Sequence, residues 1–293
     1  MARAGLAIAL CAAACTPSFQ SASDVLDLRV LAIRAEPPEA FVDLDGGTVE
    51  PVEVRVLVAD PRPRRGLSVS AAVCLPTDTR RCDEGQRLDL PPQQGGDPGE
   101  RRFRVEVPAP LVVAALQDDR LKGLGGIRVQ FSVTVDDGDP NGPVAAEKTL
   151  LYSAVPEEAA NHNPDIAAVD VFREDGTTER LGPGGTIQLG RFEQVGVRPV
   201  PGEGAAGPES YVTTDLQGRE VRLREQLQYS FFSTSAAEWD RDRADEPLPE
   251  LEPPAGGIAR LRSVRAGTGT FWIVVRDGRG GLGWIEGSLN ALE

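Results

Sequence analysis

Histidine is almost absent from this chain, because His162 is the only one among 293 residues. A zinc site with two histidine ligands is therefore excluded. A serine or cysteine nucleophile activated by histidine would have to use His162, which lies between two asparagines, and no Gly-x-Ser-x-Gly elbow occurs elsewhere. We interpret His162 as a polar residue of a connecting segment.

Lysine and aromatic residues are also scarce. Lys122 and Lys148 are the only lysines, aromatic residues make up 5%, and the net charge is −14. This balance excludes nucleic acid as a partner, because phosphates need clustered Lys and Arg, and the one dense group, Arg62, Arg64 and Arg65, lies among prolines and a glycine. The 45 acidic residues leave a carboxylate-based carbohydrate hydrolase as an alternative, but few aromatic residues are available to line a sugar cleft.

No apolar run approaches the roughly 20 residues that a transmembrane helix needs. The longest one, residues 4–14, is uncharged, follows Arg3 and ends in three alanines directly before Cys15. A short apolar run of this kind is typical of a signal peptide. An ordinary secretory signal would leave Cys15 as a free thiol, whereas Cys11 is a poor cleavage site because bulky Leu10 precedes it.

The stretch from Leu10 to Thr16 resembles the lipobox of bacterial lipoproteins, although Ala12 stands where leucine is commonest. The resemblance implies a signal peptide over 1–14, lipidation of Cys15 as the new N-terminus, and a short tether over 15–27. It also implies a bacterial cell-envelope location with a lipid anchor in a membrane, and Thr16 after the cysteine favours the outer membrane. Several acyl chains would make this anchor stable.

Two cysteines remain after these assignments. Cys74 and Cys82 lie eight positions apart in a chain expected to be exported into an oxidising compartment. We predict that they form a disulfide. A metal site is the alternative, but no further cysteine or nearby histidine is available to complete it.

Short segments rich in β-branched residues and separated by Pro, Gly and Asp predict an all-β protein. In the first half the expected strands are Leu28 to Ala35, Val52 to Ala59, Leu67 to Cys74, Arg102 to Val107, Ile127 to Val135 and Lys148 to Val155. The spacing of apolar residues from Pro108 to Gly123 predicts one short helix among them.

A proline-bounded stretch, 156–165, has no strand pattern and is predicted to be a linker. A second strand series comes after it: Ile166 to Phe172, Thr186 to Leu189, Phe192 to Val200, Ser210 to Thr214, Glu220 to Arg224, Gln226 to Ser233, Ile258 to Val264, Thr270 to Arg276 and Leu282 to Ser288. We therefore expect two tandem immunoglobulin-like antiparallel β-sandwiches, over 28–155 and 166–293.

Three stretches resemble lipoproteins of myxobacteria and related bacteria: Leu28 to Pro38 after the anchor, Asn161-His162-Asn163-Pro164 in the linker, and Phe271 to Gly281 near the end. These proteins are similar to tandem immunoglobulin-like, cadherin-like or PKD-like sandwiches. The resemblance implies a fold and a surface location, and it implies no activity.

One loop matches the opening of a calcium-binding loop. Asp137, Asp139 and Asn141 supply oxygen at alternate positions and Gly142 comes next, but Lys148 stands where a bidentate glutamate belongs. The alternative is a hairpin turn without metal. No other cofactor is expected.

An acidic run from Glu238 to Glu252 has Trp239 at its head. Such runs are mostly solvated loops, and an exposed tryptophan in a loop is a common interface anchor. Trp239 is thus the candidate interface residue. The same run is a candidate cover for the outward face of the strand that contains Trp272 and Val274. The sequence as a whole indicates a non-enzymatic envelope lipoprotein that acts as a binding or structural module, with an envelope protein or a glycan as its partner.

Overall fold

The computed structural model describes residues 21–62, 66–77, 82, 86–95, 98–156, 159–215, 217–234, 236–246 and 257–293. The predicted signal peptide and the predicted lipidation site, Cys15, lie outside the described residues. No helix in the described part of the chain has the length and apolar character needed to cross a membrane.

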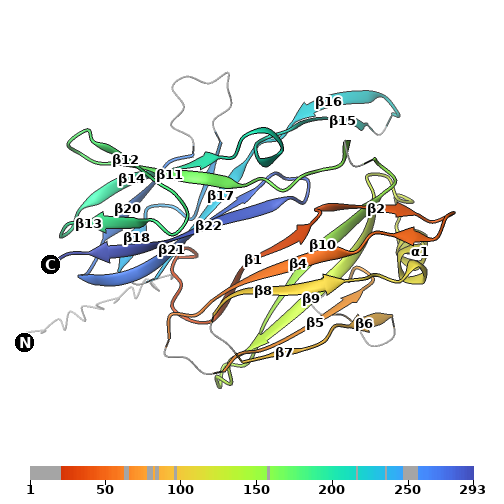
Figure 1. Cartoon of the computed structure of the whole chain (residues 1–293), viewed down its shortest axis with the longest axis horizontal. Coiled ribbons are helices and arrows are strands. Elements are labelled where there is room, and N and C mark those ends of the chain that lie inside the picture. The colour runs from red at the N-terminus through yellow and green to blue at the C-terminus, as the bar shows by residue number, and fades with distance from the viewer. Residues whose placement is uncertain are drawn as a thin grey trace, which may run out of the picture.

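The first half forms two facing sheets (Figure 1). One sheet has the order β1-β4-β8, and the other has the order β3-β2-β10-β9-β5-β6, with β7 pairing to β5. The bounds are β1 Arg29–Glu36, β2 Glu39–Asp43, β3 Thr48–Val49, β4 Val52–Ala59, β5 Ser68–Cys74, β6 Arg87–Asp89, β7 Gln93–Gln94, β8 Gly99–Val105, β9 Ile127–Asp136 and β10 Val144–Ser153.

The second half forms two five-stranded sheets and a separate hairpin. Their orders are β12-β11-β14-β20-β18, β13-β22-β21-β17-β19 and β15-β16. The bounds are β11 Ile166–Phe172, β12 Thr178–Leu181, β13 Thr186–Leu189, β14 Gln194–Pro201, η2 Gly204–Ala206, β15 Ser210–Thr214, β16 Glu220–Arg224, β17 Gln228–Ser233, β18 Ala237–Trp239, β19 Arg243–Asp245, β20 Ala259–Ser263, β21 Gly267–Arg276 and β22 Leu282–Ala291.

The predicted fold class, all-β with tandem sandwiches and a short helix in the first, is confirmed. The helix α1, Ala109–Asp118, begins after Pro108 and has Pro110 in its first turn, where the N–H groups have no partner within the helix and a proline therefore fits. It ends before Asp119, whose carboxylate accepts hydrogen bonds from the backbone N–H groups of Leu121 (3.1 Å) and Gly123 (2.8 Å). These side-chain bonds close a turn and stop the helix.

Alternation of side chains along each strand builds the two cores. In β4, Val54, Val56 and Val58 point into the first core, which they share with Phe131 of β9. In β21, Phe271 and alternate residues after it point into the second core. Every ladder between named strands joins strands of the same half, so each half closes its own core among the described residues.

The outward face of β21 is also buried, but by a different cover from the one expected. Trp272 and Val274 pack in a cluster with Leu31 of β1 and Leu57 of β4, which belong to the first sandwich. The expected cover was the acidic run headed by Trp239; its described residues are not part of this cluster, and residues 247–252 of the run lie outside the described residues. Since both halves contribute apolar side chains to this cluster, the two sandwiches are joined by a third hydrophobic core.

The described part of the predicted tether contributes to the same junction. Asp24 forms a parallel bridge to Ser233 at the end of β17, and the side chain of Val25 is fully buried in the third cluster. Residues 21–27 are therefore fixed to the second sandwich instead of forming a solvated tether. A backbone that pairs with a strand has lost the freedom that a tether requires.

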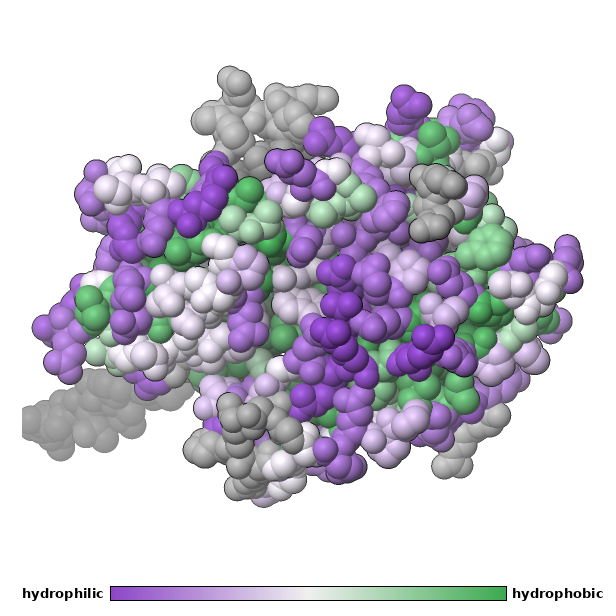
Figure 2. Space-filling model, in the orientation of Figure 1, coloured by the Kyte–Doolittle hydropathy of each residue, from purple (hydrophilic) through white to green (hydrophobic). Residues whose placement is uncertain are grey.

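The outward face of the β1-β4-β8 sheet changes character along its length. Near the junction it carries Leu57, whereas further along β4 it carries Arg55 and Glu53, which form an ion pair of 2.7 Å. Figure 2 shows hydrophilic residues over this exposed part of the sheet. The apolar part of the face is confined to the area that the second sandwich covers.

Candidate functional site

The hairpin between β21 and β22 lies against the first sandwich and is organised by one buried carboxylate. Asp277 is 4% exposed, and its Oδ1 accepts hydrogen bonds from the backbone N–H groups of Arg279 (2.7 Å), Gly280 (3.0 Å) and Gly281 (2.9 Å). A Cβ atom at position 281 would collide with this carboxylate, so the close approach requires glycine. Asp277 and Gly281 together set the shape of the hairpin.

Two buried asparagines of the predicted linker join the sandwiches. The Nδ2 of Asn161 donates to Oδ2 of Asp277 (2.9 Å). The Nδ2 of Asn163 donates to the carbonyl of Ala35 in β1 (2.7 Å), and its Oδ1 accepts from the backbone N–H of Leu282 in β22 (2.8 Å). Buried polar groups with partners on both sides hold one arrangement. The linker is therefore an ordered part of the junction here.

Arg279 lies at the centre of an acidic cluster on the same side of the junction. Its guanidinium is 2.9 Å from Glu225, 3.6 Å from Glu39 and 3.7 Å from Glu209, and it stacks 4.1 Å from the ring centroid of Tyr211. Burial raises the pKa of Glu225, and its hydrogen bonds from the backbone of Glu209 and from Arg279 oppose that shift. The arginine joins carboxylates from both sandwiches.

His162 belongs to this cluster through Glu209. Its backbone N–H donates to Oε2 of Glu209 (3.2 Å), and its ring Nδ1 lies 2.9 Å from Oε1 of the same carboxylate. The only histidine is thus a polar connector residue whose ring a carboxylate orients, and Glu209 in turn lies beside Arg279.

Lys148 links β10 of the first sandwich to the second. Its ammonium donates to the carbonyl of Gly280 in the hairpin. Burial lowers the pKa of Lys148 to about 8, and the nearby Asp277 carboxylate opposes the shift. The sequence analysis considered Lys148 as the start of a strand and as the last position of a possible calcium loop, and neither use indicated a contact with the second sandwich.

A groove of about 1450 Å³ lies beside the cluster, between the first sandwich and the β15–β16 hairpin. Phe41 of β2 (39% exposed) and Val212 of β15 (56% exposed) present apolar surface in it. Charged residues of both signs also line it: Glu39, Asp43, Asp45, Lys122, Arg128, Glu209 and Arg279. This groove is the candidate binding site.

One edge of the groove is a strand with a single partner. Among the described strands β15 pairs only with β16, and the backbone N–H of Glu225 donates to the carbonyl of Glu209 (2.9 Å) at the base of this hairpin. Hydrogen-bonded and non-bonded pairs alternate along an antiparallel ladder. The backbone groups of Ser210, Val212 and Thr214 therefore point away from β16, toward the free edge.

The predicted calcium loop holds an arginine. The guanidinium of Arg62 contacts Asp60 (2.9 Å), Asp137 and Asp139 (2.7 Å). The backbone N–H of Asn141 donates to Oδ1 of Asp139 (2.9 Å), as in a tight turn. Within the described residues, no three acidic, histidine or cysteine side chains are grouped to hold a metal ion. The arginine supplies the positive charge at these carboxylates, and calcium binding stays a prediction.

Trp239 is not an exposed loop residue, and its assignment as an interface anchor is wrong. It lies in β18, is 6% exposed, and packs in the second core with its ring centroid 4.9 Å from that of Phe231. The prediction was based on the acidic residues around Trp239. These belong to an edge strand, in which charged, exposed residues alternate with buried ones, and Trp239 is one of the buried residues. Its Nε1 has no hydrogen-bond partner in the part of the chain that the structure describes.

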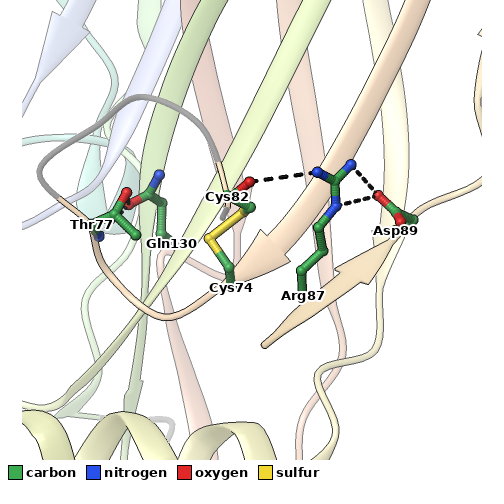
Figure 3. The surroundings of a disulfide bond; sticks show 6 residues. All are labelled: Cys74, Thr77, Cys82, Arg87, Asp89 and Gln130. Atoms are coloured by element: carbon green, nitrogen blue, oxygen red, sulfur yellow. Dashed lines mark hydrogen bonds and ion pairs between the residues drawn. A yellow bond between two sulfur atoms is a disulfide. The ribbon is translucent and has the colours of Figure 1, made fainter. Parts of the chain in front are cut away.

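The predicted disulfide is present (Figure 3). Cys74 at the end of β5 and Cys82 have Cα atoms 5.5 Å apart and are both buried. On one side of the bond, Oε1 of Gln130 accepts from the backbone N–H of Thr77 (2.8 Å). On the other side, Arg87 donates to the carbonyl of Cys82 (3.5 Å). The disulfide therefore closes a loop that is also held by hydrogen bonds.

The residues of the junction carry a local signal that was not used in the prediction. In β4, Leu57 and Ala59 fall on the face that Glu53 and Arg55 make polar. An apolar pair on the polar face of an alternating strand indicates that something covers it. The polar partners, by contrast, are separated by more than a hundred positions, as Asn161 and Asp277 are, and no local pattern joins them.

No protein-family model matches the chain, and no curated protein matches it. Among solved structures, a transglutaminase from red sea bream is 12% identical with a TM-score of 0.28, and the match covers 92% of this chain and 32% of that one. A trypsin-activated alpha-2-macroglobulin from Escherichia coli is 8% identical with a TM-score of 0.27, covering 90% of this chain and 18% of that one. The YadV chaperone is 13% identical with a TM-score of 0.23, covering 88% and 98%.

The chain thus spans about a third of the length of the transglutaminase and less than a fifth of the macroglobulin. At these identities and scores, the likenesses carry no argument about activity, ligand or partner. Any function proposed for this chain therefore rests on its own sheets, contacts and groove.

Proposed function

We propose that this protein is a lipid-anchored component of the bacterial cell envelope whose two sandwiches act as one non-catalytic binding module. In this proposal, Cys15 carries the lipid and the interdomain groove receives an extended segment of another envelope protein. The free edge of β15 is the observation that carries the binding role, because an unpaired strand edge is a template for a further strand.

The fixed junction supports a binding role. A groove whose walls come from two domains keeps its shape only if the domains do not move, and preorganised surfaces lose less entropy on binding. Asp277, Arg279 and the two asparagines connect both walls through hydrogen bonds and ion pairs. The apolar cluster around Trp272 adds a hydrophobic contact to the same junction.

A carbohydrate hydrolase would need two acids facing a substrate. Glu209, which lines the groove, and the buried Glu225 beside it both contact the same guanidinium nitrogen of Arg279, at 3.7 and 2.9 Å. Glu225 also accepts the backbone N–H of Glu209 (2.9 Å). Carboxylates held in this way by an arginine and by backbone groups favour a structural role, which is why we propose a non-catalytic protein.

Substitution of one outward backbone donor tests the groove. Val212→Pro removes an N–H that points away from β16, so the hairpin keeps its own hydrogen bonds. Val212→Thr is the matched control, because it keeps the N–H and suits a strand. The purified mature chains are immobilised and exposed to solubilised envelope, and the bound proteins are quantified by mass spectrometry.

We expect the proline variant to retain at most about a tenth of the specifically bound protein, which corresponds to about 1.4 kcal/mol of binding free energy. The threonine variant should bind like the wild type. Equal binding by the wild type and both variants would contradict strand addition, and a partner identified as a glycan would replace the proposed protein segment.

The anchor has its own test. Cys15→Ala is expressed in the cells that make the protein, which are fed labelled fatty acid and then fractionated. We expect the variant to leave the membrane fraction and to carry no label. Retention of the variant with unchanged labelling would show that the anchor lies elsewhere.

A further inference from the structure

The end of the second sandwich that lies farthest from the groove carries two large exposed apolar side chains. Phe192, in the turn before β14, is 66% exposed, and Leu292, after β22, is 54% exposed. They line a hollow of about 400 Å³ together with Arg191 and Arg265. We call these four residues the distal tip.

The turn that presents Phe192 is conformationally unusual. Phe192 has a φ of 58°, in the left-handed region that bulky residues rarely adopt. The backbone N–H of Glu193 donates to the carbonyl of Gly190 (3.1 Å), which closes the turn, and the Arg191 guanidinium lies 5.0 Å from the centroid of the Phe192 ring. A strained turn that places an aromatic ring in solvent is typical of a contact site.

The N-terminal segment of the described chain is attached near this tip. The carbonyl of Ser23 accepts from the backbone N–H of Ser233 (2.9 Å), and the Ser233 hydroxyl donates to the carbonyl of Ala237 (2.9 Å). Ala237 pairs with Ser263 in the ladder of β18 and β20, and Ser263 lines the hollow of the tip. The contacts Ser23–Ser233, Ser233–Ala237 and Ala237–Ser263 thus connect the N-terminal segment to the hollow of the tip.

The chain length between the anchor and this segment limits how the protein can sit on a membrane. Six positions separate Cys15 from Ser21, and an extended chain covers at most about 3.6 Å per residue, or roughly 22 Å. A lipid on Cys15 therefore holds the second sandwich close to the bilayer. The tip can reach the same plane.

We infer that the distal tip rests on the lipid surface to which Cys15 anchors the chain; this inference rests on the proposed lipid anchor. Phe192 and Leu292 enter the headgroup region, where aromatic and aliphatic side chains find a favourable environment. Arg191 contacts lipid phosphates, because guanidinium groups pair well with phosphate oxygens.

The contact fixes the orientation of the molecule. The strand β21 runs from the tip side at Gly267 to the hairpin at the groove, and ten residues of strand measure about 33 Å. With the tip on the membrane, the groove and the whole first sandwich point away from it. A partner in the surrounding compartment can then reach the free edge of β15.

Site-specific photocrosslinking in the full chain tests this orientation. Phe192 is replaced by benzoylphenylalanine, and in a matched control Val212, an exposed apolar residue at the groove, is replaced in the same way. Cells with labelled phospholipid are irradiated, and the protein is purified. We expect at least tenfold more labelled phospholipid on the chain modified at position 192 than on the control.

Equal phospholipid labelling at both positions, a protein adduct at position 192, or no adduct there would each overturn the inference. Fractionation of Cys15→Ala distinguishes this failure from failure of the anchor. If that variant leaves the membrane and position 192 yields no lipid adduct, the anchor stands and the orientation is wrong. If the variant stays while position 192 still yields lipid, the tip contact holds and the anchor is wrong.

Discussion

The contact between the two sandwiches can be measured by truncating its largest side chain, in the variant Trp272→Ala. Trp272 lies on the face of β21 that points away from the second core, and it is 7% exposed within the third cluster. A tryptophan side chain buries about 150–250 Å², which at about 25 cal/mol per Å² corresponds to roughly 4–6 kcal/mol. The unfolded chain already buries part of this apolar area, which reduces the free energy gained on folding. We therefore expect Trp272→Ala to lower the unfolding free energy by about 3–5 kcal/mol.

The assay is urea denaturation followed by fluorescence and by circular dichroism. The wild-type sandwiches share a buried cluster and are expected to unfold together. In Trp272→Ala the coupling weakens, and the two probes should report separate transitions. A double-mutant cycle assigns the loss to the junction: Leu31→Ala, on the opposite side of the cluster, should couple to Trp272→Ala by about 1–2 kcal/mol.

Leu261→Ala is the control partner in this cycle, because Leu261 is fully buried in the second core and outside the third cluster. Its effect should add to that of Trp272→Ala within about 0.5 kcal/mol. A loss below about 1 kcal/mol for Trp272→Ala, or additive effects with Leu31→Ala, would refute the claim that the cluster joins the sandwiches.

Three further perturbations address the polar junction and the disulfide. Asp277→Asn places an amide where the carboxylate accepts three backbone N–H groups, and it should lower the unfolding free energy, measured by thermal denaturation, by about 2 kcal/mol. Asp175→Asn, at an exposed turn, should have a much smaller effect on the melting temperature in the same thermal denaturation. Burial lowers the pKa of Lys148 from 10.5 to about 8. Below pH 8 the buried ammonium is charged and lowers the unfolding free energy; between pH 8 and 10.5 it loses its proton in the folded state only, so the unfolding free energy rises. Urea titrations should show a gain of about 3 kcal/mol across that range for the wild type relative to Lys148→Met, and parallel pH profiles would contradict the assignment. Replacing Cys74 and Cys82 together by alanine opens a short loop and should lower the unfolding free energy by about 2–3 kcal/mol relative to the wild type, with both proteins measured without reductant. No change in stability would show that hydrogen bonds alone keep the loop closed.

Several strands were predicted with the correct bounds. The expected strands 52–59, 166–172 and 186–189 coincide with β4, β11 and β13. The strands that were missed are short, such as β6 with three residues and β7 with two. A stretch of two or three residues has no period to recognise, and its place is set by the longer strand beside it.

The candidate site was predicted less well than the fold. The motif Asn161-His162-Asn163-Pro164 and the stretch ending at Gly281 were noted as features that resemble a family, but their meeting at one junction was not predicted. Trp239 was expected outside and lies in the core. The carboxylates of Asp137 and Asp139 suggested a metal ion, and they hold the Arg62 guanidinium. At the junction and at Asp137 and Asp139, the partner is distant in sequence, and side-chain type alone does not identify it.

The sequence by itself determined the all-β class, the division into two halves and the Cys74–Cys82 disulfide, because alternation, turn residues and cysteine spacing are local properties of a chain. Only the tertiary structure decided that the halves share a third core around Trp272, that Asp277 and Arg279 join them, and that residues 21–27 lie on the second sandwich. These contacts depend on how two completed sandwiches meet. How the two sandwiches pack depends on the shape and charge of their whole surfaces, and the periodicity of a single strand does not specify it.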